Sequence, residues 1–209
     1  MYKRQGVTVE ELAGIAVRSQ RNAVGNPNAL RASADVTVDD VLAGAVVADP
    51  LRATDLSAEA DGGCAVVLAA GNRARELCDR PAWIRGIDHR VDAQGLGVRD
   101  LTRSPSAALA AARSADQAGF EAAAVDVAEL HASSTAQVHL LTGELSLGED
   151  VRIDPSGGSM AGDTLMAAGL VRIAEAARQV TSGDADRALA HASSGPCLQQ
   201  NLVCLLEGE

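Results

Sequence analysis

The chain reads Val127-Ala128-Glu129-Leu130-His131-Ala132-Ser133-Ser134 where an apolar, strand-like run meets a histidine. The same pattern returns further on as Arg187-Ala188-Leu189-Ala190-His191-Ala192-Ser193-Ser194. Helical patterns alternate with apolar runs of this kind, and such alternation indicates a sheet covered by helices. The sequence therefore predicts an α/β domain with both histidines at a sheet edge where strands end, the place where ligands gather in open α/β sheets.

Capping residues and apolar runs predict the other elements. Thr8 with Glu11, and Thr37 with Asp40, have the spacing of capping boxes. The run 64–69 is apolar throughout, which is typical of a strand buried on both faces, so its cysteine is expected to be an inert core residue. Helices are expected to begin at Thr8 and to cover residues 38–43, 72–78, 104–117, 135–145 and 164–180. Strands are expected over residues 64–69, 83–89, 125–130, 187–190 and 198–206.

The composition excludes several classes of function. The 209 residues carry a formal net charge of −10 and include one Trp, one Tyr and one Phe. An acidic protein with three aromatic rings suits neither the phosphates nor the stacked bases of a nucleic acid, so no nucleic-acid partner is expected. The only lysine is Lys3, which leaves no residue for Schiff-base chemistry or for a P-loop. No apolar run is long enough to span a membrane.

The cysteines indicate where in the cell the protein is found, and the composition of residues 1–5 indicates how the chain begins. Four cysteines in a chain of this length favour reduced thiols over a disulfide framework. No signal peptide is recognisable, so a cytoplasmic protein is expected. Residues 1–5 hold the only Lys and the only Tyr, and the Ala/Val/Arg/Asp bias begins directly after them. We expect these five residues to be foreign to the natural chain.

His131 and His191 are the first candidates for chemistry. A histidine exchanges protons near neutral pH, and the hydroxyl of Ser133 with nearby loop N–H groups can hold an oxyanion. The alternative is that both histidines only cap strand ends, and that Ala-Ser-Ser carries little information in an alanine-rich chain. Because the same context occurs twice, neither interpretation outweighs the other.

Glycine loops and one cysteine accompany these histidines. Ser156, Gly157 and Gly158 form one loop and Gly195 lies in another. Glycine lets backbone N–H groups approach a ligand closely, although each of these glycines also suits an ordinary turn. Cys197 follows Gly195 closely and is a candidate nucleophile or acid–base group if a histidine lies near it. Burial without a function is the more common state of a free cysteine.

Two further kinds of site receive little support. The residues around Ser159 have Ala161 where a G-x-S-x-G elbow needs its last glycine, so a serine hydrolase is weakly supported. No spacing of histidines, cysteines and carboxylates suggests a metal site.

Five short motifs in order resemble the C-terminal half of the thiolase family, in particular the sterol-carrier-protein type and its bacterial lipid-transfer relatives. Each motif is short, but their order along residues 6–209 makes the likeness specific. The stretch Ala48-Asp49-Pro50-Leu51-Arg52 is similar to the family segment "IADPLR", and Glu59-Ala60-Asp61-Gly62-Gly63-Cys64-Ala65 is similar to "SDGAAA". Further along, Val127-Ala128-Glu129-Leu130-His131 is similar to "VAEVH", and Asp154-Pro155-Ser156-Gly157-Gly158 to "NPSGG". Near the end of the chain, Ala190-His191 is similar to the start of "AHNxG".

The resemblance implies a fold and a division of the chain. Thiolases have a layered αβαβα fold in which two similar halves pack sheet to sheet through central helices. On this basis residues 61–209 are expected to form the C-terminal half, and residues 6–60 the helices and loops that trail from the other half. The nucleophilic cysteine of the family belongs to that other half, which this sequence does not contain.

The resemblance also implies roles for single residues. His131 matches the histidine of the oxyanion hole, and Ser133 stands where the "HDCF" cysteine of the family acts as acid and base. The activating "GHP" histidine has no counterpart, and with a one-residue gap Asp163 takes its place. Asp163, His191 or Cys197 would then move protons.

The function that the resemblance implies is acyl transfer on acyl-CoA thioesters, or carbon–carbon bond cleavage, in fatty-acid or sterol side-chain breakdown. Coenzyme A would enter as part of the substrate, with no further cofactor. A homo-oligomer such as a dimer, or a complex with a partner subunit, is expected for the complete protein. The alternative is a non-catalytic thiolase-like subunit or acyl-CoA/lipid-binding protein, which the loss of acid–base residues favours.

Overall fold

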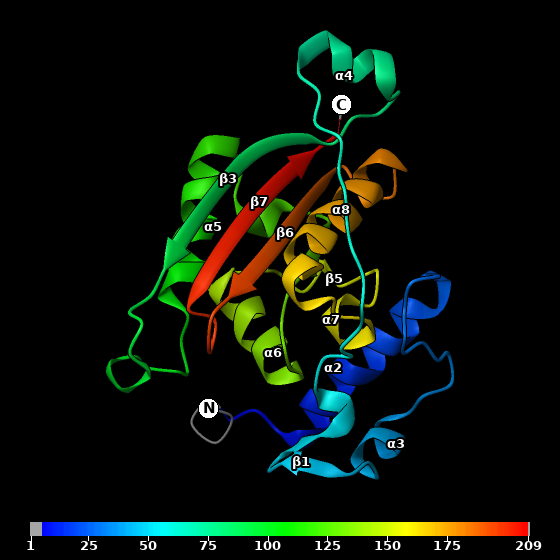
Figure 1. Ribbon diagram of the computed structural model, residues 1–209, viewed down its shortest axis with the longest axis vertical. Helices are drawn as coiled ribbons and strands as arrows, with labels where there is room; N and C mark the ends of the chain where they lie inside the picture. Colours follow the sequence, from blue (N-terminus) through cyan, green and yellow to red (C-terminus); the bar gives the residue numbers. More distant parts are fainter. Residues whose placement is uncertain (1–5, 209) are drawn as a thin grey trace.

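The structure, a computed structural model, describes residues 6–208, so the expected foreign start at residues 1–5 lies outside the described part (Figure 1). Its centre is a five-stranded mixed sheet. β4 runs parallel to β5 and β6, whereas β7 runs antiparallel to β6 and β3. The strand order is β3 (Trp83–Val91), β7 (Gln200–Glu207), β6 (Arg187–Ser194), β4 (Val127–Leu130) and β5 (Arg152–Ile153). The predicted α/β class is confirmed.

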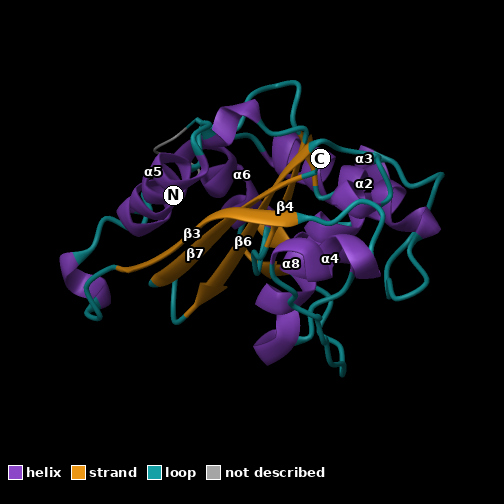
Figure 2. Cartoon of the chain, turned by 90° about the horizontal axis from the view of Figure 1, so that it is seen from above, coloured by secondary structure: helices purple, strands orange, loops and turns teal. Residues whose placement is uncertain are grey.

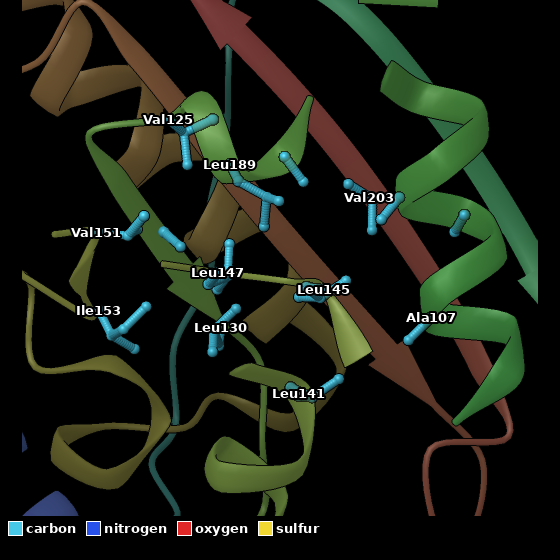
Figure 3. Close-up of a cluster of buried hydrophobic side chains, with 14 of the residues drawn as sticks. Ala107, Val125, Leu130, Leu141, Leu145, Leu147, Val151, Ile153, Leu189 and Val203 are labelled. Carbon is cyan, nitrogen blue, oxygen red and sulfur yellow. The ribbon is translucent and has the colours of Figure 1, made fainter. Parts of the chain in front are cut away.

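Helices cover both faces of this sheet (Figure 2). α5 (Pro105–Ala118) packs on β3 and β7, and α8 (Ala168–Thr181) packs on β6 and β4. The alternation of strand side chains explains the two layers, because Leu189 points into the larger core while Ala188 and Ala190 point toward α8. The larger core also holds Leu141 of α6 (Thr135–Glu144), Leu145 and Val151 of the segment after α6, and the strand residues Leu130 and Val203 (Figure 3).

The helix ends follow the sequence closely. Capping boxes begin α2 (Val9–Asn22) at Thr8 and α3 (Val38–Leu42) at Thr37, as predicted. Gly119 ends α5 in the left-handed region, with a φ of 77°. Smaller elements complete the chain: β1 (Val46–Ala48), β2 (Leu51–Arg52), α4 (Gly71–Leu77), α7 (Gly158–Ala161) and 3-10 turns at Ala23–Gly25, Ala53–Asp55, Leu96–Val98, Ala122–Ala124 and Leu165–Ala167.

One predicted strand is wrong. Residues 64–69 lie outside the five-stranded sheet and form no ladder with any described strand. Cys64 is accordingly half-buried rather than a core residue, and Val67 is 88% exposed. An apolar run gives no information about which sheet will receive it, and the sheet of this chain is complete without it.

The predicted helix over 164–180 is nearly correct. It begins as the 3-10 turn Leu165–Ala167 and continues as α8. Leu165 adopts a φ of 49°, which prevents a regular first turn from starting at Thr164. Across residues 6–208 no helix combines the length and apolarity needed to cross a membrane.

Candidate functional site

The two His-Ala-Ser-Ser segments lie side by side at one edge of the sheet. β4 and β6 are parallel neighbours, and the first segment follows the end of β4 at Leu130. The second segment forms the last four residues of β6, so the prediction that His191 lies at the end of a strand is wrong: the pairing with β7 continues to Ser194. The backbone N–H of His131 donates to the carbonyl of His191 over 3.1 Å. The hydroxyl of Ser193 donates to the carbonyl of His131 over 3.1 Å, which joins the second segment to the first.

The ring of His131 is held in one tautomer. Its Nδ1 accepts a hydrogen bond from the backbone N–H of Ser193 over 3.2 Å. A neutral ring therefore carries its proton on Nε2, and this atom lies 3.8 Å from Oδ1 of Asp163. Burial lowers the pKa of His131, the carboxylate of Asp163 opposes this shift, and the positive charge of Arg172 adds to it. A neutral histidine that offers an N–H suits the polarisation of a carbonyl oxygen.

Asp163 is buried, with hydrogen bonds to its backbone and to its carboxylate. The residue is 2% exposed. The backbone N–H of Asp163 donates to the carbonyl of Ala58 over 2.7 Å, and Oδ1 accepts from the N–H of Leu165 over 2.9 Å. The 3-10 turn that replaces the start of the expected helix thus supplies the N–H that orients this carboxylate.

A buried ionic network supports the glycine loop beside this site. Nη1 of Arg172 lies 3.0 Å from Oε2 of Glu129 and donates to the hydroxyl of Ser156 over 3.1 Å. Both oxygens of Glu129 accept from Ser156, one from its N–H over 2.9 Å and one from its hydroxyl over 2.7 Å. Burial raises the pKa of Glu129 to about 7, against the attraction of Arg172. Sequence reasoning missed Glu129 and Arg172, since neither stands in a motif of polar residues.

Positive φ angles shape this loop. Gly157 and Gly158 have φ values of 95° and 61°, which favour glycine. A Cβ at Gly157 would lie 2.6 Å from the Cβ of Ala23. Asp154 begins the loop, and its Oδ1 accepts from the N–H of Leu130 over 2.7 Å. Burial raises the pKa of Asp154 to about 6.

The structure places His191 inside the core. The residue is fully buried, and its Nε2 lies 2.8 Å from Oδ1 of Asn201. The amide nitrogen of Asn201 donates to the hydroxyl of Ser106 and to the carbonyl of Leu198, so the amide oxygen is the acceptor for His191. Burial lowers the pKa of His191 to about 4. A neutral, enclosed ring of this kind holds structure together and does not suit proton exchange with a substrate.

The other predicted residues lie further out. Ser133 is exposed, and its backbone is fixed by Gln137 Oε1 and by the N–H of Ser57. Cys197 is exposed in the β6–β7 loop with a φ of 53°, and no hydrogen bond joins its thiol to a histidine among residues 6–208. Gly195, in the same loop, has a φ of 72°. The structure thus brings His131 and Asp163 together, buries the Ser156–Gly158 loop against Glu129 and Arg172, and leaves Cys197 at the surface.

Comparison with known proteins finds an acetyltransferase and an aldolase among the relatives of this chain. No protein-family model matches the chain. An acetyl-CoA acetyltransferase from Methanothermobacter thermautotrophicus is 31% identical over 204 residues, which cover 86% of this chain and 51% of that protein. A steroid side-chain-cleaving aldolase from Thermomonospora curvata is 35% identical over 92 residues, covering 44% of this chain and 22% of that protein.

The structural comparison agrees with these relatives. A solved structure of the Ltp2-ChsH2(DUF35) aldolase superimposes with a TM-score of 0.83 at 21% identity. The superposition covers 99% of this chain and 60% of that chain. At this identity the likeness concerns the fold alone. The chain spans about half the length of the acetyltransferase that it matches.

Proposed function

The chain belongs to the thiolase family, and from this premise we propose that it forms the part of an acyl-CoA acyltransferase that holds the thioester carbonyl of the substrate. The observation that carries the proposal is the fixed tautomer of His131. Its Nδ1 is occupied by the N–H of Ser193, so its Nε2–H is the ring's remaining donor. A preorganised donor at a partly enclosed position stabilises the oxyanion that develops when a thioester is attacked.

Asp163 is the proposed acid–base group. Its Oδ1 lies beside the Nε2–H of His131, so the carboxylate is within reach of a group bound there. Ser133 replaces the cysteine of the related motif, and a serine hydroxyl of ordinary acidity is a poor acid–base group at neutral pH. His191 is enclosed by the core and Cys197 stands apart in its loop, so we assign neither of them a proton-transfer step.

The Ser156–Gly158 loop is the proposed support beneath the substrate site, since all three residues are buried. Its glycines let the backbone pack closely against Ala23 and Asp154, and the network of Glu129 and Arg172 holds Ser156. We propose that Gly195 lines the site itself, because the β6–β7 loop follows Ser193, which holds His131.

The substrate class has two candidates within one chemistry. The acetyltransferase relative favours transfer of an acyl group between thiols, and the aldolase relative favours cleavage of a carbon–carbon bond in a steroid side chain. Both reactions require a polarised carbonyl, which His131 would supply. We propose acyl-CoA thioesters of fatty-acid or sterol side-chain breakdown as substrates, with coenzyme A as a substrate moiety.

A non-catalytic role is the second candidate. The specific observation in its favour is Ser133, because its side chain cannot replace the thiol of the related motif in acid–base chemistry. In that role the chain binds an acyl-CoA for another subunit, as the two-component name of the solved aldolase illustrates for that protein. Cys64, Cys78, Cys197 and Cys204 are all free thiols, which supports a cytoplasmic location for either role.

An acyl-transfer assay separates the two roles. Protein expressed from its whole gene is given acetoacetyl-CoA and a longer 3-ketoacyl-CoA, with free coenzyme A as acceptor. We expect turnover that falls about a hundredfold or more in His131→Ala, the usual loss when one oxyanion donor is removed. His139→Ala, on helix α6, is the matched control and should keep full activity. Retained acyl-CoA binding without any turnover would leave only the non-catalytic role.

A further inference from the structure

The loop between β6 and β7 contains two strained residues. The pairing of the two strands ends at Ser194 and Gln200. Within the loop, Cys197 and Leu198 have φ values of 53° and 56°, in the left-handed region that residues other than glycine rarely adopt. Backbone of this kind persists only where the surrounding structure holds it. The side chains that bind this loop therefore decide its shape.

Arg99 holds the carbonyl of the first strained residue. It lies in the segment between β3 and α5, directly after the 3-10 turn Leu96–Val98 (Figure 1). Its Nη2 donates to the carbonyl of Cys197 over 2.6 Å, and its Nη1 donates to the carbonyl of Pro196 over 3.1 Å. A planar guanidinium suits two successive carbonyls, because its donors are fixed as a fork. The side chain is 6% exposed, so the loop carbonyls take the place of water around its charge.

A carboxylate lies beside this guanidinium. Oδ2 of Asp92 is 3.9 Å from Nη2 of Arg99, so the two charges attract each other without a hydrogen bond. The backbone N–H of Asp92 donates to the carbonyl of Gln199 over 2.8 Å, and Oδ2 accepts from the hydroxyl of Ser106 in α5 over 2.7 Å. Asp92 thus binds the β6–β7 loop at a second point and connects it to α5.

Asn201 holds the carbonyl of the second strained residue. Its amide nitrogen donates to the carbonyl of Leu198 over 2.8 Å and to the hydroxyl of Ser106 over 2.7 Å. Its amide oxygen lies 2.8 Å from Nε2 of His191, whose carbonyl accepts from the N–H of His131 over 3.1 Å. Each strained residue therefore has its carbonyl fixed by one side chain.

We propose that Arg99 is a positioning residue for His131. Ser193, four residues before Cys197, donates its N–H to Nδ1 of His131 and its hydroxyl to the carbonyl of His131. By holding the carbonyls of Pro196 and Cys197, Arg99 keeps the N–H of Ser193 aligned with the ring, and the ring keeps its proton on Nε2. The catalytic consequence rests on the proposed function, whereas the positioning itself does not.

NMR of the His131 ring tests the positioning. Protein expressed from its whole gene carries isotope-labelled histidine, and the ring signals of His131 are identified by their loss in His131→Ala. Arg99→Met keeps the apolar stem and removes the donors, so the Nδ1 signal should move toward that of a ring nitrogen without a hydrogen bond. Arg103→Met is the matched control, because Arg103 lies in the same segment but pairs with Glu144 and is 63% exposed. An Nδ1 signal unchanged in Arg99→Met overturns the proposal.

Hydrogen exchange of backbone amides separates positioning from general support of the fold. In Arg99→Met the amide of Ser193 should exchange about tenfold faster, as expected when hydrogen bonds from a charged group are lost. The amide of Leu130 in β4 should stay as slow as in the unmodified protein. Arg99→Lys keeps the charge but not the fork, so it should give an intermediate rate at Ser193. Equal acceleration at Ser193 and Leu130 would mean that Arg99 only supports the fold, and it would overturn the proposal.

Turnover tests the catalytic consequence separately. With acetoacetyl-CoA as substrate, kcat should fall about tenfold in Arg99→Met while KM changes little, because the donor at His131 is less well aligned in the transition state. A moved Nδ1 signal with unchanged kcat supports the positioning and counts instead against the proposed role of His131. A fall in kcat with the Nδ1 signal and the exchange of Ser193 unchanged overturns the positioning.

Discussion

Nε2 of His131 lies 3.8 Å from Oδ1 of Asp163, although the two residues come from different loops at one edge of the sheet. His131 follows directly after β4. The backbone N–H of Asp163 donates to the carbonyl of Ala58, which joins Asp163 to the segment 56–60. This pair places a ring N–H and a carboxylate side by side in a partly enclosed position, which is the arrangement on which the proposed function rests.

Removing the charge of Asp163 should lower the pKa of His131. The carboxylate raises that pKa and so offsets part of the lowering by burial. In Asp163→Asn the largest raising influence is gone, while burial and Arg172 continue to lower the pKa of His131. The measurement is an NMR titration of the His131 ring, with Asp150→Asn at an exposed loop position as control. An unchanged midpoint in Asp163→Asn would show that the two side chains do not interact.

A side chain at Gly157 should destabilise the fold. Its φ of 95° strains any other residue, and a Cβ would lie 2.6 Å and 2.7 Å from the Cβ atoms of Ala23 and Ala161. We expect Gly157→Ala to cost about 2–4 kcal/mol in the free energy of unfolding, from strain and overpacking together. Gly183→Ala is the matched control, because its φ of 82° is similar but the space around it is open. Urea unfolding of both variants should show the larger loss at Gly157, and equal losses would argue against the close packing of the loop.

Replacing only one member of the Glu129–Arg172 pair should lower the free energy of unfolding more than replacing both. Arg172→Met leaves the carboxylate of Glu129 buried without a counterion, and such a change costs about 3–5 kcal/mol. Glu129→Gln combined with Arg172→Met removes both charges and should recover much of that loss. The comparison uses chemical unfolding of the single and double variants. A double variant no more stable than Arg172→Met would mean that the two charges are not coupled.

The buried ring of His191 should make the fold sensitive to mild acid. Its pKa of about 4 in the folded protein lies below the ordinary value near 6.5, so the unfolded chain binds the proton more readily. The contribution of His191 to stability is therefore complete above pH 6.5 and is lost as the pH falls toward 4. Thermal unfolding of His191→Gln should show a smaller decline across this window than the unmodified protein.

The comparison with the unmodified protein is essential for that measurement. Glu129 and Asp154 have raised pKa values, and their contributions change in the opposite direction, being lost as the pH rises toward about 7 and 6. Only the difference between variant and unmodified protein isolates His191. Parallel pH profiles would show that the ring titrates as it does in solvent.

Much of the fold was predictable because local patterns decided it. The capping boxes at Thr8 and Thr37, and the glycine at position 119, set helix ends without help from distant residues. The strand at residues 64–69 was predicted wrongly, since a sequence pattern gives the preference for a strand but not the neighbour that pairs with it.

The site was predictable in part for similar reasons. The first His-Ala-Ser-Ser segment begins where β4 ends, as the pattern predicted, and His131 there meets Ser193. The second copy was predicted wrongly, because β6 continues through His191 to Ser194. The enclosure of His191 follows from strand geometry, because a residue two positions after the buried Leu189 points to the same face. The ionic network could not be predicted from the sequence, because Glu129 and Arg172 become partners only when β4 and α8 pack together.

Ligand binding tests the central claim most directly. Isothermal titration with acetoacetyl-CoA and with free coenzyme A separates contacts to the thioester from contacts to the rest of the molecule. If His131 holds the thioester carbonyl, His131→Ala, which has no side-chain donor, should weaken acetoacetyl-CoA binding about tenfold, the loss of one hydrogen bond of about 1.4 kcal/mol, and leave coenzyme A binding unchanged. Equal affinities of the variant and the unmodified protein for acetoacetyl-CoA would contradict the account.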